Sequence, residues 1–600
     1  MAKGKISVNT ENLMPIIKKW LYSDTDIFMR ELISNAQDAI TKHKKLVSVG
    51  EAEKESSYAI NVEVKKDDKE IVISDNGIGM TEEEVKKYIN QVAFSGAEEF
   101  VEKYKNEKND DNKIIGHFGL GFYSAFMAAS EVEIDTLSYA PGSEAVHWVS
   151  DGVSEYKITK SKKTTRGTDI TLHVSDENAD LLEKGKIRSI LNKYCAFLPI
   201  EIYLTDGSEG DKEVAPINDT NPLWLKKPCD CTDEEYKEFY HKVFMDFNDP
   251  LFWIHLNVDY PFNLKGILYF PKLNHEFQSI EGQIKLYNNQ VFIADNIKEV
   301  TPEYLMLLKG VIDCPDLPLN VSRSFLQNDG YVNKVSSHII KKVADKLNSL
   351  YKTENEKFTS YWDDINPFIK YGCMRDEKFY DRVKDILIFK KLDDTYISLK
   401  DLLERDSKEI FYVTDPTAQS QYIELLKSEN IEMIYLNNAI DDHFISLLEY
   451  KNPGLKFKRV DSYVSDSLKS SDENKDTDEA LKTLFEKFAG EAKVEVQALK
   501  SADISAMYIL SEEARRMEEM SKMYGNMGMM NLPKSERTLI VNSASPLVQK
   551  LDSIGDETKK DDICREIINI AKLSHNTLTA EDKNAFIKNT TDILLKYISE

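Results

Sequence analysis

Apolar and polar positions follow two different rhythms along the first 205 residues, which predicts a domain built from helices and strands. Apolar residues recur every three to four positions over 11–23 and 27–46, as in amphipathic helices. They alternate with polar residues over 58–64, 70–76 and 168–174, as in half-buried strands. We therefore expect a helix-plus-sheet sandwich that ends near Leu204.

Two polar stretches, 205–222 and 465–480, interrupt this patterning and favour three domains. Between them, strand and helix patterns alternate at 252–260, 265–270, 283–293, 334–352 and 399–405. After them come a Met-rich helical segment, a strand at 537–545 and helices at 561–573 and 583–598. The predicted fold is α+β and multidomain: an N-terminal α/β sandwich (1–218), an α/β middle domain (219–490) and a mainly helical C-terminal domain (491–600).

Composition and charge narrow the class of protein. A chain of 600 residues is too long for a single hydrophobic core. A content of 41% hydrophobic and 30% charged residues is typical of a globular protein. Lys and Arg number 78 against 103 Asp and Glu, a net charge of −25 that works against binding nucleic acid phosphates. Neither a signal peptide nor an uninterrupted apolar run of about 18 residues occurs, so we expect a cytoplasmic protein that does not bind membranes.

The spacing of the cysteines indicates reduced thiols rather than a metal site. Only Cys229 and Cys231 of the six lie close together, and no second Cys or His pair accompanies them at zinc spacing.

Three polar residues of the 27–46 helix lie on one predicted face. Glu31, Asn35 and Asp38 are spaced four and three positions apart, whereas Leu32, Ile33 and Ala36 fall on the opposite, apolar side. A solvent-facing stripe would explain the polar face equally well. A ligand-binding face is the alternative.

Three glycine-containing segments suggest a nucleotide pocket. The strand at 70–75 runs into Asp75 and then Asn76-Gly77-Ile78-Gly79-Met80, where a carboxylate could accept a hydrogen bond from an exocyclic amine. Gly116, Gly119 and Gly121 precede Phe122 and an apolar helical run, whose free backbone N–H groups could bind an anion. Arg166-Gly167-Thr168 adds a tight turn and a hydroxyl at a strand start. Each segment alone is also explained by an ordinary turn or loop.

The order of these segments resembles the Bergerat ATP-binding group, which includes DNA gyrase B subunits, heat-shock protein 90 chaperones, sensor histidine kinases and mismatch-repair ATPases. ELISNAQDAI, SDNGIGM, HFGLGFYSAF and RGTDITL are similar to the heat-shock protein 90 versions. EGQIKLYNNQVFIADN and LPLNVSRSFLQ, further along the chain, also resemble that family. A P-loop motif is absent from the sequence.

The resemblance implies roles for the pocket residues, with ATP and Mg²⁺ as cofactors. Glu31 would orient or deprotonate the attacking water, and Asn35 would hold Mg²⁺, with Asp38 supporting them. Asp75 would bind the adenine amine. The remaining pocket residues would line the base or meet the phosphates: Gly79, Met80, Thr168, Gly116, Gly119, Gly121 and Phe122.

The resemblance also implies a catalytic arginine from the middle domain. Arg323 would reach the γ-phosphate, with Asn320 and Gln327 beside it. Residues 91–121 would form a lid over the nucleotide. Many relatives carry a lysine where this chain has Phe94, so a phosphate-facing lysine is not expected at that position.

The C-terminal domain suggests partners. Met507, Met517, Met520, Met523, Met527, Met529 and Met530 could form an adaptable client-binding surface or fill a core. The closing helices carry apolar residues that suit either a dimer interface or intramolecular packing: Ile567, Ile568, Ile570, Leu573, Ile593, Leu594, Leu595 and Ile598. The resemblance favours a homodimer, with unfolded or partly folded clients and other chaperones as partners.

The function that the sequence favours is therefore an ATP-dependent chaperone with a slow Mg²⁺-dependent ATPase, which remodels clients through lid closure and dimer clamping. A DNA-acting ATPase is disfavoured by the charge, and a histidine kinase by the start of the ATP motifs near residue 31. An ATP-independent holdase is disfavoured by the presence of Glu31 and Arg323. The short first linker and the KYISE end resemble bacterial members of the family.

Overall fold

The structure is a computed structural model, in which the chain divides into two compact units, 1–343 and 344–600. It describes residues 24–91, 94, 96, 100, 103, 119–152, 155–207, 215–272, 283–317, 319, 330–462, 475–510, 537–574, 578 and 580–599. The predicted helix at 11–23 lies outside the described residues. The domain boundaries at 218/219 and 490/491 stay predictions.

A seven-stranded sheet is the first layer of unit 1, in the order β5-β4-β3-β6-β2-β1-β7. Neighbouring strands run antiparallel, apart from the parallel pair β1 and β7. The strands are β1 (Ala59–Lys65), β2 (Glu70–Asp75), β3 (Ala129–Leu137), β4 (Val146–Ser150), β5 (Tyr156–Lys160), β6 (Gly167–Val174) and β7 (Glu201–Thr205). Alternate residues of β2 are buried, which confirms the period-two pattern.

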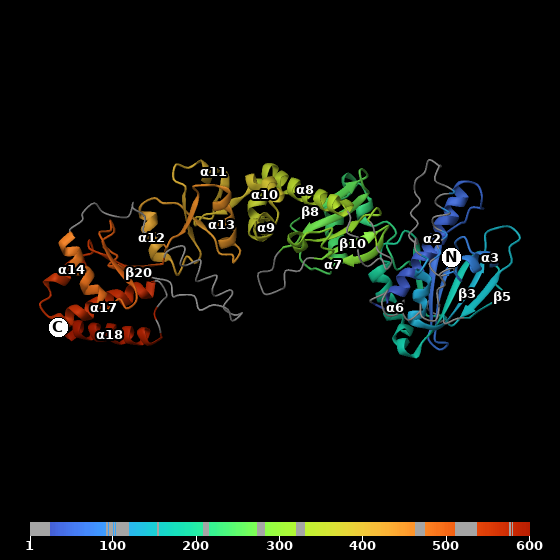
Figure 1. The fold of residues 1–600 in the computed structure, drawn as a ribbon, viewed down its shortest axis with the longest axis horizontal. Helices are drawn as coiled ribbons and strands as arrows, with labels where there is room; N and C mark the ends of the chain where they lie inside the picture. Colours follow the sequence, from blue (N-terminus) through green and yellow to red (C-terminus); the bar gives the residue numbers. More distant parts are fainter. Residues whose placement is uncertain are drawn as a thin grey trace, which may run out of the picture. The chain divides into compact units, whose positions relative to one another are not determined.

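Helices form the second layer and cover one face of this sheet. They are α2 (Ile27–Ser48), α3 (Glu82–Tyr88), α5 (Ala125–Ala128) and α6 (Lys184–Tyr194), with the 3-10 helices η2 (Gly121–Ser124) and η3 (Asp176–Leu182). The long helix α2 packs on β1, β2 and α6 (Figure 1). Its residues Leu32, Ile33 and Ala36 lie in the core, as the amphipathic pattern predicts. The α/β sandwich is thereby confirmed.

A second, five-stranded sheet completes unit 1 in the order β11-β10-β12-β9-β8. Only β10 and β12 run parallel. The elements here are η4 (Leu223–Leu225), η5 (Pro228–Asp230), α7 (Asp233–Phe244), β8 (Phe252–Val258), β9 (Leu264–Phe270), β10 (Ile284–Asn288), β11 (Val291–Asp295), η6 (Glu303–Leu307) and β12 (Lys309–Asp313). The strands predicted at 252–260 and 265–270 are β8 and β9. The single strand predicted at 283–293 is instead a hairpin of β10 and β11 with a turn at 289–290.

Unit 2 combines helices with three small sheets. The helix α8 (Gly330–Thr353), predicted at 334–352, crosses the division between the units. The sheets are β13–β14, the parallel β16-β15-β17 and the mixed β18-β20-β19. The strands are β13 (Ile388–Lys390), β14 (Tyr396–Ser398), β15 (Glu409–Val413), β16 (Met433–Tyr435), β17 (Lys456–Arg459), β18 (Lys493–Gln497), β19 (Ala506–Leu510) and β20 (Arg537–Asn542).

The helices of unit 2 include those predicted at 399–405, 561–573 and 583–598, together with several that were not predicted individually. They are α9 (Asn355–Arg375), α10 (Glu377–Val383), η7 (Lys384–Ile386), α11 (Leu399–Glu404), α12 (Ser420–Ser428), α13 (Asp441–Lys451), α14 (Lys475–Glu486), α16 (Pro546–Gln549), η9 (Lys550–Ser553), α17 (Glu557–Ser574) and α18 (Ala580–Ser599). The closing helices predicted at 561–573 and 583–598 are α17 and α18. Together these elements confirm the multidomain α+β class.

The Met-rich segment is only partly described. Met507 lies on β19, is 1% exposed and packs in an apolar core, so core filling is the correct alternative for this residue. The other methionines of the segment lie outside the described residues. Within the described ranges, no helix has the length and apolar character needed to cross a bilayer.

Candidate functional site

A cavity of about 440 Å³ lies in unit 1 between α2, the sheet and the glycine-rich segment. It brings together the predicted residues Glu31, Asn35, Asp38, Asp75, Gly79, Met80, Gly119, Gly121, Phe122 and Thr168, all of which line it. These residues come from four segments separated by up to about 140 positions. Tertiary folding therefore gathers the motifs into one site with the size of a small-molecule pocket.

The polar face of α2 forms one wall of the cavity. Glu31 and Asp38 are buried at 2% and 6% exposure, and Asn35 is half-buried between them. A solvent-facing stripe is therefore the wrong reading of this helix. A buried carboxylate is costly unless a partner or ligand compensates for its lost hydration, so this face is suited to a polar ligand.

Arg30 orients the Glu31 carboxylate. Its guanidinium donates to Glu31 Oε1 from Nε at 3.1 Å and from Nη2 at 2.9 Å, with both side chains buried. The guanidinium also lies 5.7 Å from the centre of the Tyr194 ring on α6. On the cavity side, a Cβ added to Gly121 would lie 2.7 Å from Glu31 Oε2, so a side chain there would displace the Glu31 carboxylate. The second carboxylate oxygen thus borders the glycine-rich segment.

Asp75 ends β2 at the bottom of the cavity. Its Oδ1 accepts a hydrogen bond of 2.7 Å from the Gly77 backbone N–H, and its backbone pairs with that of Thr168 on β6. Burial disfavours the ionised form and raises the pKa of this carboxyl from 3.8 to about 7, although the Gly77 hydrogen bond and Lys163 oppose the shift. A group that changes charge near pH 7 therefore lies in the pocket.

The turn after Asp75 is held from the neighbouring strand. Arg166 donates to the Gly77 carbonyl from Nε at 2.9 Å and to the Asn76 carbonyl from Nη2 at 2.8 Å. Gly79 has a φ of +64°, and a Cβ there would lie 1.9 Å from the Leu137 carbonyl oxygen. No L side chain fits at this position, so the glycine of the motif is a steric requirement.

Nucleotide affinity should depend on pH because of Asp75. In the role that the resemblance implies for Asp75, only the ionised carboxylate accepts a hydrogen bond from the exocyclic amine. With a pKa of about 7, the affinity for ADP should then fall roughly tenfold between pH 8 and pH 6. Since Asp75 binds its proton more tightly in the folded state, its contribution to the free energy of unfolding falls as the pH rises from about 4 to about 7. Calorimetric titrations with ADP would measure the effect. Adenosine is the control, because it has no phosphate group that titrates in this pH range. Equal affinity across this range would contradict the prediction.

Thr136 on β3, which sequence reasoning missed, supports two residues of the cavity wall. Its hydroxyl accepts a 2.9 Å hydrogen bond from the Met80 backbone N–H, lies 3.0 Å from Thr168 Oγ1 and reaches the Gly167 carbonyl at 3.2 Å. The side chain is fully buried, and its hydrogen bonds link the turn after Asp75 to β6. The only indication in the sequence was a polar residue at an inward-facing position of a strand, which is weak evidence for a role in a site.

Replacing Thr136 with valine should lower both the stability of the domain and its affinity for ADP. Valine has a similar shape but leaves the Met80 N–H without its acceptor, which should lower the free energy of unfolding by about 1–3 kcal/mol and weaken ADP binding several-fold. Chemical denaturation and ADP calorimetry would test this. Thr171→Val, on the same sheet but with a half-exposed side chain, is the matched control and should change neither.

Lys42 is a second missed residue, and its side chain lines the cavity. Burial lowers its pKa, while the charges of Asp38 and Glu84 raise it. Its position, four residues after Asp38 on the face of α2 that carries Glu31 and Asn35, could have predicted that it lines the same site.

Phe94 also lines the cavity and stacks on Tyr88 with ring centres 6.1 Å apart. An apolar ring therefore lines the cavity at position 94, where no phosphate-facing lysine was expected.

The predicted residues Gly116, Asn320, Arg323 and Gln327 lie outside the described residues, as does most of the predicted lid. Their roles, and the role of Asn35 toward Mg²⁺, stay predictions.

Comparison with known proteins agrees with this site. Residues 25–177 match the model of the histidine kinase-, DNA gyrase B- and HSP90-like ATPases, and residues 208–598 match that of the Hsp90 proteins. The chain belongs to the heat-shock protein 90 family. The ATPase match spans α2 to β6 and contains every residue named above as lining the cavity.

Bacterial proteins are similar over almost the whole chain of this heat-shock protein 90 member. The chaperone protein HtpG of Porphyromonas gingivalis is 42% identical over 599 residues, covering 95% of this chain and 87% of the relative. Its namesake in Bacteroides fragilis is 42% identical over 588 residues, covering 93% and 85%. That of Fusobacterium nucleatum is 33% identical over 613 residues, covering 98% of each. The recognition of a bacterial-type heat-shock protein 90 is confirmed.

Proposed function

We propose that this protein is an ATP-dependent molecular chaperone that hydrolyses ATP slowly with Mg²⁺ and uses lid closure and dimer clamping to remodel client proteins in the cytoplasm. The observation that carries the proposal is the single cavity lined by Glu31, Asn35, Asp75 and the glycine-rich segment. Family membership and the chaperone names of the relatives support it.

The cavity suits an adenine nucleotide. Asp75 offers a buried acceptor to the exocyclic amine, beside Gly79, Met80 and Thr168. At the other end Gly119 and Gly121 border the cavity, where backbone N–H groups can meet phosphates. The amide oxygen of Asn35, one helical turn from Glu31, is a ligand type that Mg²⁺ accepts, and the ion would neutralise phosphate charge.

Glu31 has the position for the water-activating role. Arg30 holds one carboxylate oxygen, and the other lies toward Gly121, where the phosphate end of a nucleotide would be. An ionised carboxylate in this position can take a proton from an attacking water. Arg323 of the middle domain, with Asn320 and Gln327, would stabilise the charge that develops on the γ-phosphate.

A homodimer is the assembly that the C-terminal helices favour. Ile567 and Ile568 are buried in the core of unit 2, whereas other apolar side chains of α17 and α18 are between 48% and 79% exposed: Ile570, Leu573, Ile587, Ile593, Leu594, Leu595 and Ile598. An apolar face of this extent is typical of a surface that a second subunit covers.

Introducing charge on α18 should therefore break the dimer. The double variant Leu594→Glu Ile598→Glu should raise the dimer dissociation constant by at least about 100-fold, because each side chain contributes about 1.5–3 kcal/mol when buried. Sedimentation velocity would measure the mass. Lys588→Glu, an exposed change on the same helix, should leave the dimer intact, and a dimeric double variant would contradict the assignment.

Turnover and client protection, measured side by side, test the function itself. The wild-type protein should hydrolyse ATP and reduce the aggregation of a heat-denatured model enzyme in an ATP-dependent way. A DNA-acting ATPase, the second class with this nucleotide fold, would instead show turnover that rises with DNA and falls steeply with salt. That result, without client protection, would overturn the proposal.

A further inference from the structure

The sheet face opposite the helices carries rows of histidine and carboxylate side chains. In the strand register His173 of β6 lies between Glu70 of β2 and Glu131 of β3. Glu133, two positions along β3, projects from the same face because strand side chains alternate. Neither the nucleotide cavity nor the core uses these residues.

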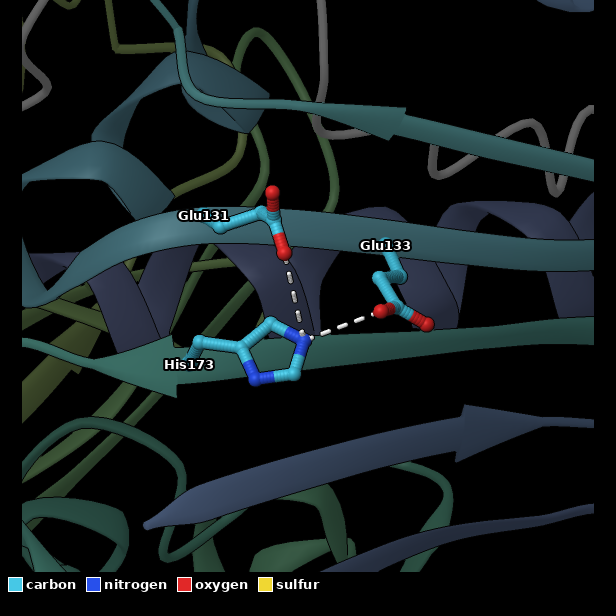
Figure 2. A group of neighbouring side chains, drawn as sticks. All are labelled: Glu131, Glu133 and His173. Carbon is cyan, nitrogen blue, oxygen red and sulfur yellow. Dashed lines mark hydrogen bonds and ion pairs between the residues drawn. The ribbon is translucent and has the colours of Figure 1, made fainter. Parts of the chain in front are cut away.

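Two carboxylates converge on one imidazole nitrogen. Figure 2 shows Glu131 and Glu133 directed at His173 Nε2, which lies 3.0 Å from Glu133 Oε1 and 3.9 Å from Glu131 Oε1. One oxygen from each carboxylate and one ring nitrogen lie within 4.8 Å of one another. Ligand atoms bonded to one zinc-like ion at about 2.1 Å are roughly 3.0–3.4 Å apart, so small side-chain rotations would complete a site.

The charge balance of this face favours a cation. Among the described residues, neither Glu131 nor Glu133 has a lysine or arginine nitrogen within 4.0 Å, and His173 is the ion-pair partner of both. Lys163 is paired with Asp169 in a neighbouring row instead. Adjacent carboxylates on one strand face repel each other, and a shared cation would relieve that repulsion.

Glu70 lies beside the other nitrogen of the imidazole ring. Its Oε1 lies 3.6 Å from Nδ1 of His173, on the opposite side of the ring from Glu131 and Glu133. A histidine that binds a metal typically directs its other ring nitrogen to a carboxylate, which sets the tautomer and orients the ring. A small rotation would bring Glu70 within hydrogen-bond distance of Nδ1, and an ion bound at Nε2 would replace the present hydrogen bond between Nε2 and Glu133.

We propose that His173, Glu131 and Glu133 bind one divalent transition-metal ion of the zinc class on the outer face of this sheet, with Glu70 as a positioning residue. Imidazole with carboxylate suits zinc better than magnesium, which prefers oxygen ligands alone. The same three strands contribute Ile73, Ile134 and Ile170 to the nucleotide cavity from their other face. The ion therefore ties together strands that form the pocket wall.

Zinc titration of the untagged full-length chain tests this site. Calorimetry with Zn²⁺, in excess Mg²⁺ and without nucleotide, should detect saturable binding that His173→Gln weakens at least about tenfold. Glu131→Gln Glu133→Gln should weaken it comparably, and Glu70→Gln less. Zinc should also raise the thermal midpoint of the wild type and not that of His173→Gln. X-ray absorption of the zinc complex should show nitrogen and oxygen ligands at about 2.0–2.1 Å.

Matched controls separate this site from others. His443→Gln removes an exposed histidine of α13 and should leave zinc affinity unchanged. His147→Gln tests the adjacent group of Glu133, Asp135 and His147, and should change affinity less than His173→Gln. ADP affinity should stay at the wild-type value in His173→Gln, which shows that the domain is folded. Unchanged zinc binding in His173→Gln, or its absence in the wild type, would overturn the proposal.

Discussion

Replacing Glu31 with glutamine should lower ATP turnover by about 10²–10⁴-fold, the range that a positioned general base contributes, while ATP affinity changes little. The amide keeps the size of the side chain, and its oxygen can still accept from Arg30. It cannot take a proton from water. Single-turnover hydrolysis and ATP calorimetry on the same preparation would measure the two quantities.

Glutamine is a sharper test than alanine because of the Arg30–Glu31 pair. Both side chains are buried, and removing one partner of such a pair costs about 3–5 kcal/mol. A loss of turnover in Glu31→Ala could therefore come either from the missing carboxylate or from local unfolding around Arg30. Glu82→Gln, an exposed carboxylate at the start of α3, is the control and should hydrolyse ATP normally. If Glu31→Gln lost ATP binding to the same degree as turnover, the catalytic role would be wrong.

The second large effect is expected for Asp75→Asn, which should weaken ATP and ADP binding by at least about 100-fold. The Gly77 N–H donates to Oδ1 at 2.7 Å, so the amide oxygen of asparagine must keep that position. The NH₂ group is then directed toward the cavity, where it opposes the donor hydrogens of the adenine amine. A buried acceptor has become a donor.

Two comparisons isolate this effect. Asp68→Asn makes the same charge change in an exposed turn and should retain full affinity. Because asparagine does not titrate, the residual binding of Asp75→Asn should also lose the pH dependence expected from a pKa of about 7. Calorimetry at pH 6 and pH 8 would measure both. Wild-type affinity in Asp75→Asn would show that the base does not bind through this side chain.

Local patterns along the chain were sufficient for the main elements around the cavity and for most of its lining residues. The 27–46 periodicity corresponds to α2, and the alternation at 70–76 corresponds to β2 and its turn, because burial repeats with the period of each element. Glycine spacing was equally informative, since Gly79 has a conformation and a contact that no other residue tolerates.

Residues that act across strands were not predictable in this way. Thr136 joins the site through hydrogen bonds to Met80 and Thr168, which lie 56 and 32 positions away. His173 meets Glu131 only through the register of β3 and β6. Periodicity describes neighbours along one element, whereas register depends on how separate elements pair.

The sequence by itself therefore determined the family, the nucleotide-binding motifs and the amphipathic faces, because short-range spacing and residue type encode them. Tertiary structure alone decided that the polar face of α2 is a cavity wall rather than a solvent-exposed stripe. It also decided that Asp75 is buried enough to raise its pKa, and that a histidine and two glutamates share one position on the outer face. Burial and cross-strand proximity are properties of the packed chain, and they set the charge and the chemistry of these groups.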